Sequence, residues 1–179
     1  YLSHGSAEAN YRMGRCLFEG DMYEQNYPQA LEYFAKAVKE GCHDASPYYI
    51  NMLWFGNNVE KNQEIVLTTY KELAEHNDEV ATYYLYTLYN DDQFSGKNQE
   101  TAVAYLQKSA DMGYDEALKE LGLQYCEDGI FETDLKKANE YFALAAEKGN
   151  TVAMVNLAIS YQIGREVEKN LSKALELYN

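Results

Sequence analysis

A period of 36 residues runs through this chain, and it limits the possible folds more than any other feature. Alanine recurs at this spacing at Ala9, Ala45, Ala81, Ala117 and Ala153. Self-similarity at a period of about 20 to 50 residues is typical of repeat proteins, in which each copy buries its apolar face against its neighbours. The sequence therefore predicts one repeat domain over residues 1–179, with copies at 9–44, 45–80, 81–116 and 117–152 and a truncated copy at 153–179.

Each copy is predicted to contain two helices, and the second has a clear start and end. A residue that caps helix N-termini recurs at Asn26, Asn62, Asn98, Asp134 and Asn170. A residue that enters the left-handed conformation at low cost recurs at Gly41, Asn77, Gly113 and Gly149. Apolar residues between these positions recur at three- and four-residue spacing, as on one face of a helix.

One position on the first helix governs how closely the paired helices can pack. It is occupied by Gly14, Gly122 and Ala158 in copies one, four and five, and by Ile50 and Tyr86 in copies two and three. Small residues let helices approach closely, whereas large ones separate them. We therefore expect local distortion in copies two and three.

The fourth copy closely resembles the Sel-1-like repeat (SLR), a family in the tetratricopeptide-repeat-like superfamily. The residues that match are Ala117, Leu121, Gly122, Tyr125, Gly129, Asp134, Lys137, Ala138, Ala145, Ala146 and Gly149. The resemblance spans the chain, although copy two departs from it at Val66 and Asn77. It implies an all-α fold, a right-handed α-solenoid of about five helix-turn-helix repeats. It also implies a scaffold for protein assembly that has no catalytic residues and no cofactor.

Charge narrows the class of partner. The chain carries 29 acidic and 15 basic residues, for a formal net charge of −14. Nucleic acids and anionic membranes bind basic surfaces, so this balance disfavours both. A neutral or basic protein or peptide fits better. The sequence has no apolar run near the roughly 20 residues that a membrane-spanning helix needs, so no membrane insertion is expected.

The cysteines and the end of the chain give two further expectations. Cys16, Cys42 and Cys126 do not recur at one position of the repeat, which favours free thiols and a reducing compartment such as the cytoplasm. The sequence stops inside the second helix of copy five, as a fragment would. Three residues of this helix, Leu175, Leu177 and Tyr178, would then be partly uncovered, and the chain could self-associate through this end.

The resemblance places the first helices on the concave face of the solenoid, which gives a set of predicted partner-binding residues. These are Tyr11, Arg15, Phe18, Asn51, Trp54, Phe55, Tyr83, Thr87, Asn90 and Lys119. Aromatic, arginine and asparagine side chains combine buried area with directional hydrogen bonds, as binding hot spots do.

Two alternatives stay open for these residues. Arg15, Asn51 and Thr87 share one repeat position and could clamp a peptide backbone or carboxylate, or could merely solvate the groove or bond neighbouring helices. The aromatic residues Phe18, Trp54 and Phe55 could equally belong to the core.

No catalytic or metal-binding pattern was found in the sequence. H-E-x-x-H, C-x-x-C, G-x-S-x-G and S-x-x-K are all absent, and Cys42, His43 and Asp44 are consecutive residues whose side chains point apart. We therefore predict a non-enzymatic scaffold that binds a protein or peptide segment on the concave face. The alternatives are a structural spacer or dimerisation module and, less favoured, a hydrolase, which would need a pocket with converging titratable groups.

A row of aliphatic residues in copy five bears on the dimerisation alternative. It consists of Val152, Val155, Ile159 and Ile163, at helical spacing. We expect it to pack against a following repeat or a second copy of the chain more readily than against a ligand.

Overall fold

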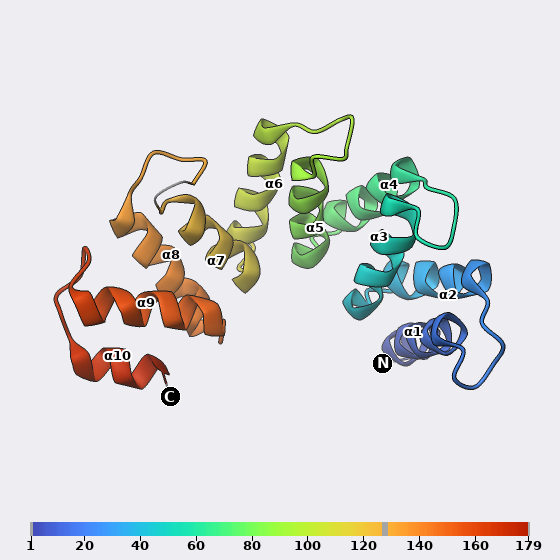
Figure 1. Ribbon diagram of the computed structural model, residues 1–179, viewed down its shortest axis with the longest axis horizontal. Coiled ribbons are helices and arrows are strands. Elements are labelled where there is room, and N and C mark those ends of the chain that lie inside the picture. Colours follow the sequence, from blue (N-terminus) through green and yellow to red (C-terminus); the bar gives the residue numbers. More distant parts are fainter. Residues whose placement is uncertain (1, 127–128, 179) are drawn as a thin grey trace. The chain divides into compact units, whose positions relative to one another are not determined.

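The computed structural model describes residues 2–126 and 129–178, with side chains from residue 6 onward (Figure 1). Every regular element in these ranges is helical, and the helices form the antiparallel pairs of a repeat protein, which confirms the predicted all-α solenoid class. The chain packs as two compact units, Tyr1–His76 and Asn77–Asn179, where the sequence predicts one repeat domain.

Unit 1 contains two helix pairs. These are α1 (Leu2–Glu19) with α2 (Tyr27–Lys39), and α3 (Ser46–Phe55) with α4 (Gln63–Glu75). A short 3₁₀ turn, η1 (His43–Ala45), joins the pairs and packs against both α2 and α3.

Unit 2 continues the alternation, and each of its helices packs against the next along the chain. Its helices are α5 (Glu79–Asn90), α6 (Gln99–Asp111), α7 (Asp115–Gln124), α8 (Leu135–Glu147), α9 (Thr151–Ile163) and α10 (Leu171–Tyr178). In the part of the chain that the structure describes, no helix is both long enough and apolar enough to cross a membrane.

A single residue ties together the two helices of each copy. The Asn26 side chain accepts a hydrogen bond from the backbone N–H of Gln29 at 3.1 Å, while its own N–H donates to the Leu17 carbonyl at 2.9 Å. The same two bonds recur at Asn62, Asn98, Asp134 and Asn170. The side-chain bonds confirm the predicted caps, and the backbone bonds use a carbonyl near the end of the preceding helix that would otherwise lack a partner.

The second helices end as the sequence predicts. Backbone φ is +84° at Gly41, +60° at Asn77, +89° at Gly113 and +94° at Gly149. This left-handed turn redirects the chain into the next first helix. Asparagine at Asn77 adopts it more readily than most residues other than glycine.

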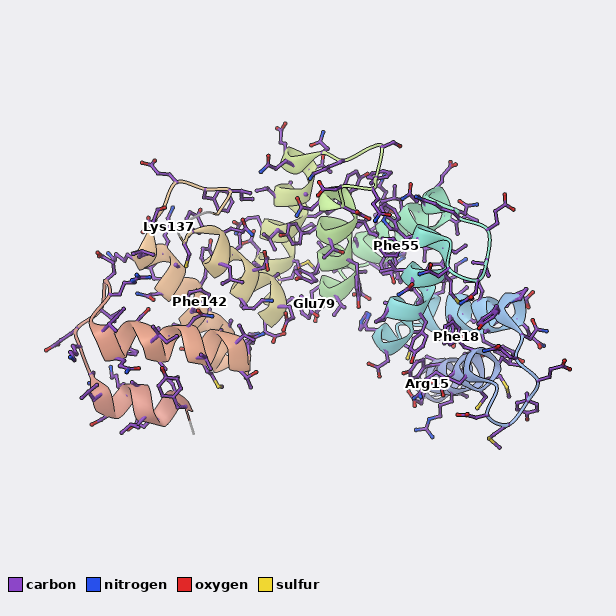
Figure 2. All side chains as sticks on the ribbon, viewed as in Figure 1. Arg15, Phe18, Phe55, Glu79, Lys137 and Phe142 are labelled. Carbon is purple, nitrogen blue, oxygen red and sulfur yellow. The ribbon has the colours of Figure 1, made fainter. Side chains whose placement is uncertain are left out.

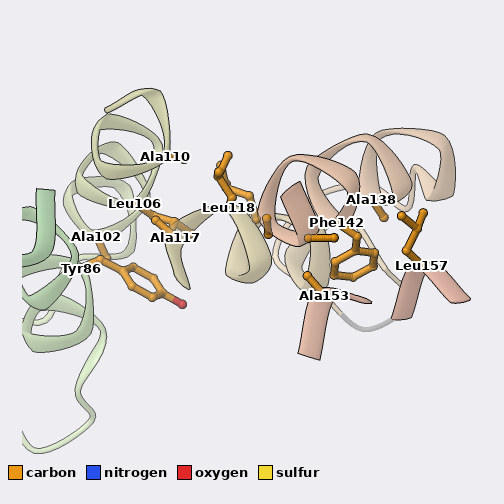
Figure 3. Packing of buried hydrophobic residues seen from close by; sticks show 13 residues of the cluster. Tyr86, Ala102, Leu106, Ala110, Ala117, Leu118, Ala138, Phe142, Ala153 and Leu157 are labelled. Atoms are coloured by element: carbon orange, nitrogen blue, oxygen red, sulfur yellow. The ribbon is translucent and has the colours of Figure 1, made fainter. Parts of the chain in front are cut away.

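Two glycines on first helices allow the close packing expected of them. A Cβ atom added at Gly122 would lie 2.5 Å from the Phe142 ring, and one added at Gly14 would lie 2.7 Å from the Phe34 ring. Phe142, labelled in Figures 2 and 3, is 3% exposed and sits in the core of unit 2. The ring of the second helix therefore packs directly on the backbone of the first.

Copies two and three, which have a large residue at the position of these glycines, differ from each other. Copy two has the η1 turn before its first helix, and Ile50 is only partly buried. Copy three keeps the regular pairing of α5 with α6 despite Tyr86. The Tyr86 ring is buried, and its hydroxyl donates a hydrogen bond to Glu120 on α7 at 3.1 Å. The large side chain therefore points toward the next copy.

The core of unit 2 repeats a small residue followed by a large one on each second helix. Ala102 and Leu106 of α6 and Ala138 and Phe142 of α8 are all at most 3% exposed (Figure 3). The cluster is completed by Ala110, Ala145 and Ala146 of the second helices and by Tyr86, Ala117, Leu118, Leu121, Ala153 and Leu157 of the first helices. Each copy thus buries its apolar face against its neighbours, as a solenoid requires.

Replacing Gly122 by alanine is expected to destabilise unit 2 by about 1 to 3 kcal/mol, because the new methyl group would overlap the Phe142 ring. Urea denaturation followed by circular dichroism measures this loss. Adding Phe142→Leu shortens the opposing side chain. The double variant should therefore lose less free energy of unfolding than the sum of the losses in the two single variants. Additive losses would contradict the proposed contact, and Leu144→Ala, at a side chain 47% exposed, is the control.

Candidate functional site

A cavity of about 500 Å³ opens in unit 1 between α1 and α3 and is the candidate site. Its lining consists of Phe18, Pro47, Tyr48, Asn51, Met52, Gly56, Asn57 and Asn58. We call it the unit 1 pocket. It brings together Phe18 and Asn51, which the sequence predicts as binding residues. Among the other lining residues, Tyr48, Met52, Gly56, Asn57 and Asn58 were not indicated by the repeat pattern.

The aromatic walls of the unit 1 pocket are held by further rings. Phe18 and Tyr48 meet edge to face, with centroids 5.5 Å apart and planes at 80°. Tyr48 stacks on the fully buried Phe34 at 4.8 Å and 19°, and Phe18 meets Tyr27 edge to face at 5.4 Å. Contacts of this kind favour one arrangement of the rings, so the pocket is largely preformed.

The polar side of the pocket comes from the end of α3 and the turn that follows it. The Asn57 side-chain amide donates to Oδ1 of Asn51, and the backbone N–H of Gly56 donates to the Asn51 carbonyl. Gly56 and Asn58 both have positive φ, at +76° and +66°, which curls the chain back on itself. Three asparagine side chains are thereby gathered at one edge of the pocket.

Trp54 is not on the exposed face that the sequence predicts. It is 0% exposed, and the prediction that it lines an accessible groove is wrong. The helix α3 buries Tyr49, Met52 and Leu53 as well, so it is apolar on more than one face and places its largest side chain in the core. The nearly unbroken apolar run at 48–55 is the sequence signal for this burial.

The other predicted residues of unit 1 remain accessible. Phe55, at the end of α3, is 44% exposed, and Tyr11 on α1 is half-buried. Arg15, labelled with Phe18 and Phe55 in Figure 2, donates two hydrogen bonds to Glu19 on its own helix, at 2.6 and 2.9 Å. A ligand carboxylate would have to compete with Glu19 for this guanidinium.

The predicted residues of unit 2 are mostly engaged with their own unit. The Thr87 hydroxyl donates to the Tyr84 carbonyl at 2.8 Å, and Lys119 lies 2.9 Å from Glu116, with its side chain only 15% exposed. Asn90 is exposed at the end of α5. The polar ladder of Arg15, Asn51 and Thr87 is therefore divided between the two units, and all three of its members already have intramolecular partners.

Tyr83 belongs to a group of tyrosines beside carboxylates in unit 2. Its ring meets Tyr114 edge to face at 5.4 Å. Burial, followed by the charges of Glu120 and Glu116, raises the pKa of Tyr83. Burial also raises the pKa of Tyr114 to about 12, with smaller contributions from Tyr84 and nearby carboxylates. These phenols therefore stay protonated over the physiological pH range and can act as hydrogen-bond donors.

The aliphatic row of α9 is exposed along its length. The exposed fractions are 51% at Val152, 44% at Val155, 43% at Ile159 and 55% at Ile163. Within the described residues, no following helix covers this row. Among the described residues of unit 2, it is the longest exposed aliphatic row on one helix. Its position in the repeat matches that of Glu116, Lys119 and Leu123 one copy earlier.

Three potential metal ligands meet in unit 1, namely Glu8, Cys42 and Asp44, with ligand atoms all within 4.8 Å of one another. The sequence pattern did not connect Glu8 with the other two. Burial raises the pKa of the Cys42 thiol, the backbone N–H groups of Ala45 and Asp44 lower it, and the two carboxylates raise it. A metal ion at these residues would have to displace the thiol proton, because the thiolate is the form of cysteine that ligates metals.

Comparison with protein-family models assigns the repeats. The model described as "Sel1 repeat" matches residues 7–42, 79–114, 115–150 and 151–179, well over half of the chain. The chain belongs to the Sel1 repeat family. The matched Sel1 segments share the 36-residue period and begin two residues before the copies defined above. The segment left unmatched contains η1, α3 and α4, where the sequence also departs from the Sel1 pattern.

Solved structures with Sel1 repeats have the same fold. A Sel1 repeat protein from Oxalobacter formigenes is 25% identical, with a TM-score of 0.74 over 96% of this chain and 70% of its own. A protective antigen of uropathogenic Escherichia coli strains, described as displaying an SLR fold, is 22% identical, with a TM-score of 0.71 over 97% of this chain and 37% of its own. An immunity protein from Pseudomonas aeruginosa is 25% identical, with a TM-score of 0.64 over 96% and 63%. A comparison with curated protein sequences finds no significant match.

Stability at high pH is expected to depend on Tyr114. An unfolded phenol loses its proton near pH 10.0, whereas Tyr114 in the fold keeps its proton up to about pH 12. Because the folded state binds this proton more tightly, the free energy of unfolding should fall as pH rises through this window. Urea titrations between about pH 9 and pH 12 should show a smaller fall for Tyr114→Phe, with the exposed Tyr23→Phe as reference. Equal slopes in the parent and Tyr114→Phe would contradict this assignment.

Proposed function

We propose that this chain is a non-enzymatic scaffold that binds a protein or peptide segment at the unit 1 pocket. Sel1 repeat proteins are generally protein-interaction scaffolds. The observation that carries the finer proposal is the pocket itself, which combines aromatic walls with a cluster of side-chain amides. Such a lining offers apolar contact area together with groups that hydrogen-bond a peptide backbone.

The lining favours binding over catalysis. Among its described residues, Tyr48 is the only titratable one, so the pocket lacks the converging acid, base and nucleophile that hydrolysis requires. The net charge of −14 makes an acidic partner unfavourable overall. A neutral or basic segment is therefore the expected partner of the full chain, and nucleic acid is not.

Selection from a displayed library of random peptides tests this proposal. The full chain should enrich binders, and Phe18→Ala and Asn51→Ala should each weaken the recovered peptides at least tenfold, because each variant removes one kind of contact in the pocket. Met22→Ala, at an exposed side chain in the turn after α1, is the control and should bind normally. Peptides that bind the parent and both pocket variants equally well would exclude the unit 1 pocket as their site.

A second candidate function is self-association through the end of unit 2. It is favoured by the exposed aliphatic row of α9 and by Leu171, Leu175 and Tyr178 of α10, which are 56%, 63% and 45% exposed. Packing this row against the same row of a second chain would remove apolar surface of both chains from water.

Sedimentation over a range of concentrations tests self-association. The parent should approach twice the monomer mass, whereas a double variant carrying Val155→Glu and Ile159→Glu should stay monomeric, because charges would then be buried at the contact. Ile65→Glu is the matched control, since Ile65 is a comparably exposed aliphatic residue on α4 of unit 1. A parent that is monomeric at all concentrations would exclude this function.

A further inference from the structure

We propose that the unit 1 pocket is specific for an uncharged, proline-containing segment bound in an extended, polyproline-type conformation. This inference rests on the proposed peptide-binding function and adds the chemistry of the partner. Three properties of the pocket support it, namely its neutrality, the geometry of its two aromatic walls and the position of its asparagine amides.

The unit 1 pocket is neutral on a strongly acidic protein. Its described lining contains no lysine, arginine, aspartate or glutamate, although the chain has 44 such residues, 15 basic and 29 acidic. The cavity in unit 2 around Tyr125 contrasts with it, because that cavity is lined by Glu132, Asp134, Lys136, Lys137 and Glu166. A charged side chain entering the unit 1 pocket would lose hydration without gaining an ion pair. The lining therefore selects an uncharged occupant.

The aromatic walls fit a compact apolar ring. Phe18 and Tyr48 stand at 80° to each other, so they form a corner with one ring face and one ring edge. Pro47 and Met52 extend this apolar surface. Aromatic-lined grooves of this kind bind the pyrrolidine rings of proline-rich segments, whose preformed conformation loses little entropy on binding.

The asparagine amides distinguish an extended segment from a helix. Asn51 accepts from Asn57 through Oδ1, which leaves its Nδ2 group to serve as a donor. Asn57 and Asn58 lie on the turn that follows α3, and both also line the pocket. A bound helix would present backbone carbonyls that are already hydrogen-bonded, whereas a polyproline-type segment has no internal hydrogen bonds, and its carbonyls can accept from these amides. The amide cluster is therefore used fully only by an extended backbone.

Nuclear magnetic resonance titration of the full chain tests this inference. The probes are a capped peptide of proline, alanine and serine about ten residues long, the same peptide with every proline replaced by alanine, and a lysine-rich amphipathic peptide. The proline peptide should shift the side-chain amide signals of Asn51, Asn57 and Asn58. Its affinity should fall at least tenfold on replacement of the prolines, and it should exceed that of the lysine-rich peptide.

Substitutions in the lining test whether the proline peptide binds in the unit 1 pocket. Phe18→Ala should weaken the proline peptide at least tenfold, and Asn51→Ala, at an exposed helix position where alanine is well tolerated, should weaken it without affecting folding. Thermal melts check that both variants fold. Tyr23→Ala is the matched control, because Tyr23 is an exposed aromatic residue of unit 1 that does not line the pocket, and it should bind as the parent does.

The outcomes separate this inference from the proposed function. If the alanine or lysine-rich peptide binds the pocket as well as the proline peptide, peptide binding stands and the specificity for proline is overturned. If the asparagine signals stay unmoved by all three peptides while peptides selected from the random library move them, the same conclusion follows. If neither the probes nor any selected peptide moves them, both the inference and the proposed function are overturned.

Discussion

The fold depends on one residue in each copy that makes two hydrogen bonds, one to each helix of the pair. At Asn26 and its four counterparts, the side chain caps the second helix while the backbone N–H bonds a carbonyl near the end of the first. The two helices of a pair are therefore held in register by a single position in the sequence. This register sets the large residue of the second helix, such as Phe142, against the small residue of the first, such as Gly122. The core of each unit follows from that pairing.

Much of this architecture could be predicted because it rests on local chemistry. Capping asparagines and left-handed glycines act within a few residues of the chain, so Asn98 and Gly113 mark the ends of α6 in the sequence as they do in the structure. The caps of two first helices, Asp78 and Asn150, were not predicted, although their residue types indicate them. The backbone bond from each capping residue to the preceding helix leaves no mark in the sequence, because any residue except proline can donate it.

The candidate site was predictable only in part. Phe18 and Asn51 were expected on an accessible face, and both line the unit 1 pocket. Tyr48 and Asn57 were not expected there. Tyr48 lies outside the repeat positions expected to face the groove, and Asn57 lies in a turn whose path depends on the positive φ of Gly56. Trp54 was misplaced because a position rule taken from regular copies was applied to the one copy that the Sel1 model does not match. Whether Arg15 already has a partner also depends on side-chain conformation, which periodicity does not determine.

The burial of Trp54 makes unit 1 separately observable by spectroscopy. It is the only tryptophan of the chain, and it lies in the core of unit 1, whereas the aromatic residues of unit 2 are tyrosines and phenylalanines. Indole emission excited at the red edge of the absorption band thus reports on the first two helix pairs alone, while far-ultraviolet ellipticity averages over both units. Disagreement between the two signals during denaturation would reveal that the units unfold as separate cooperative blocks.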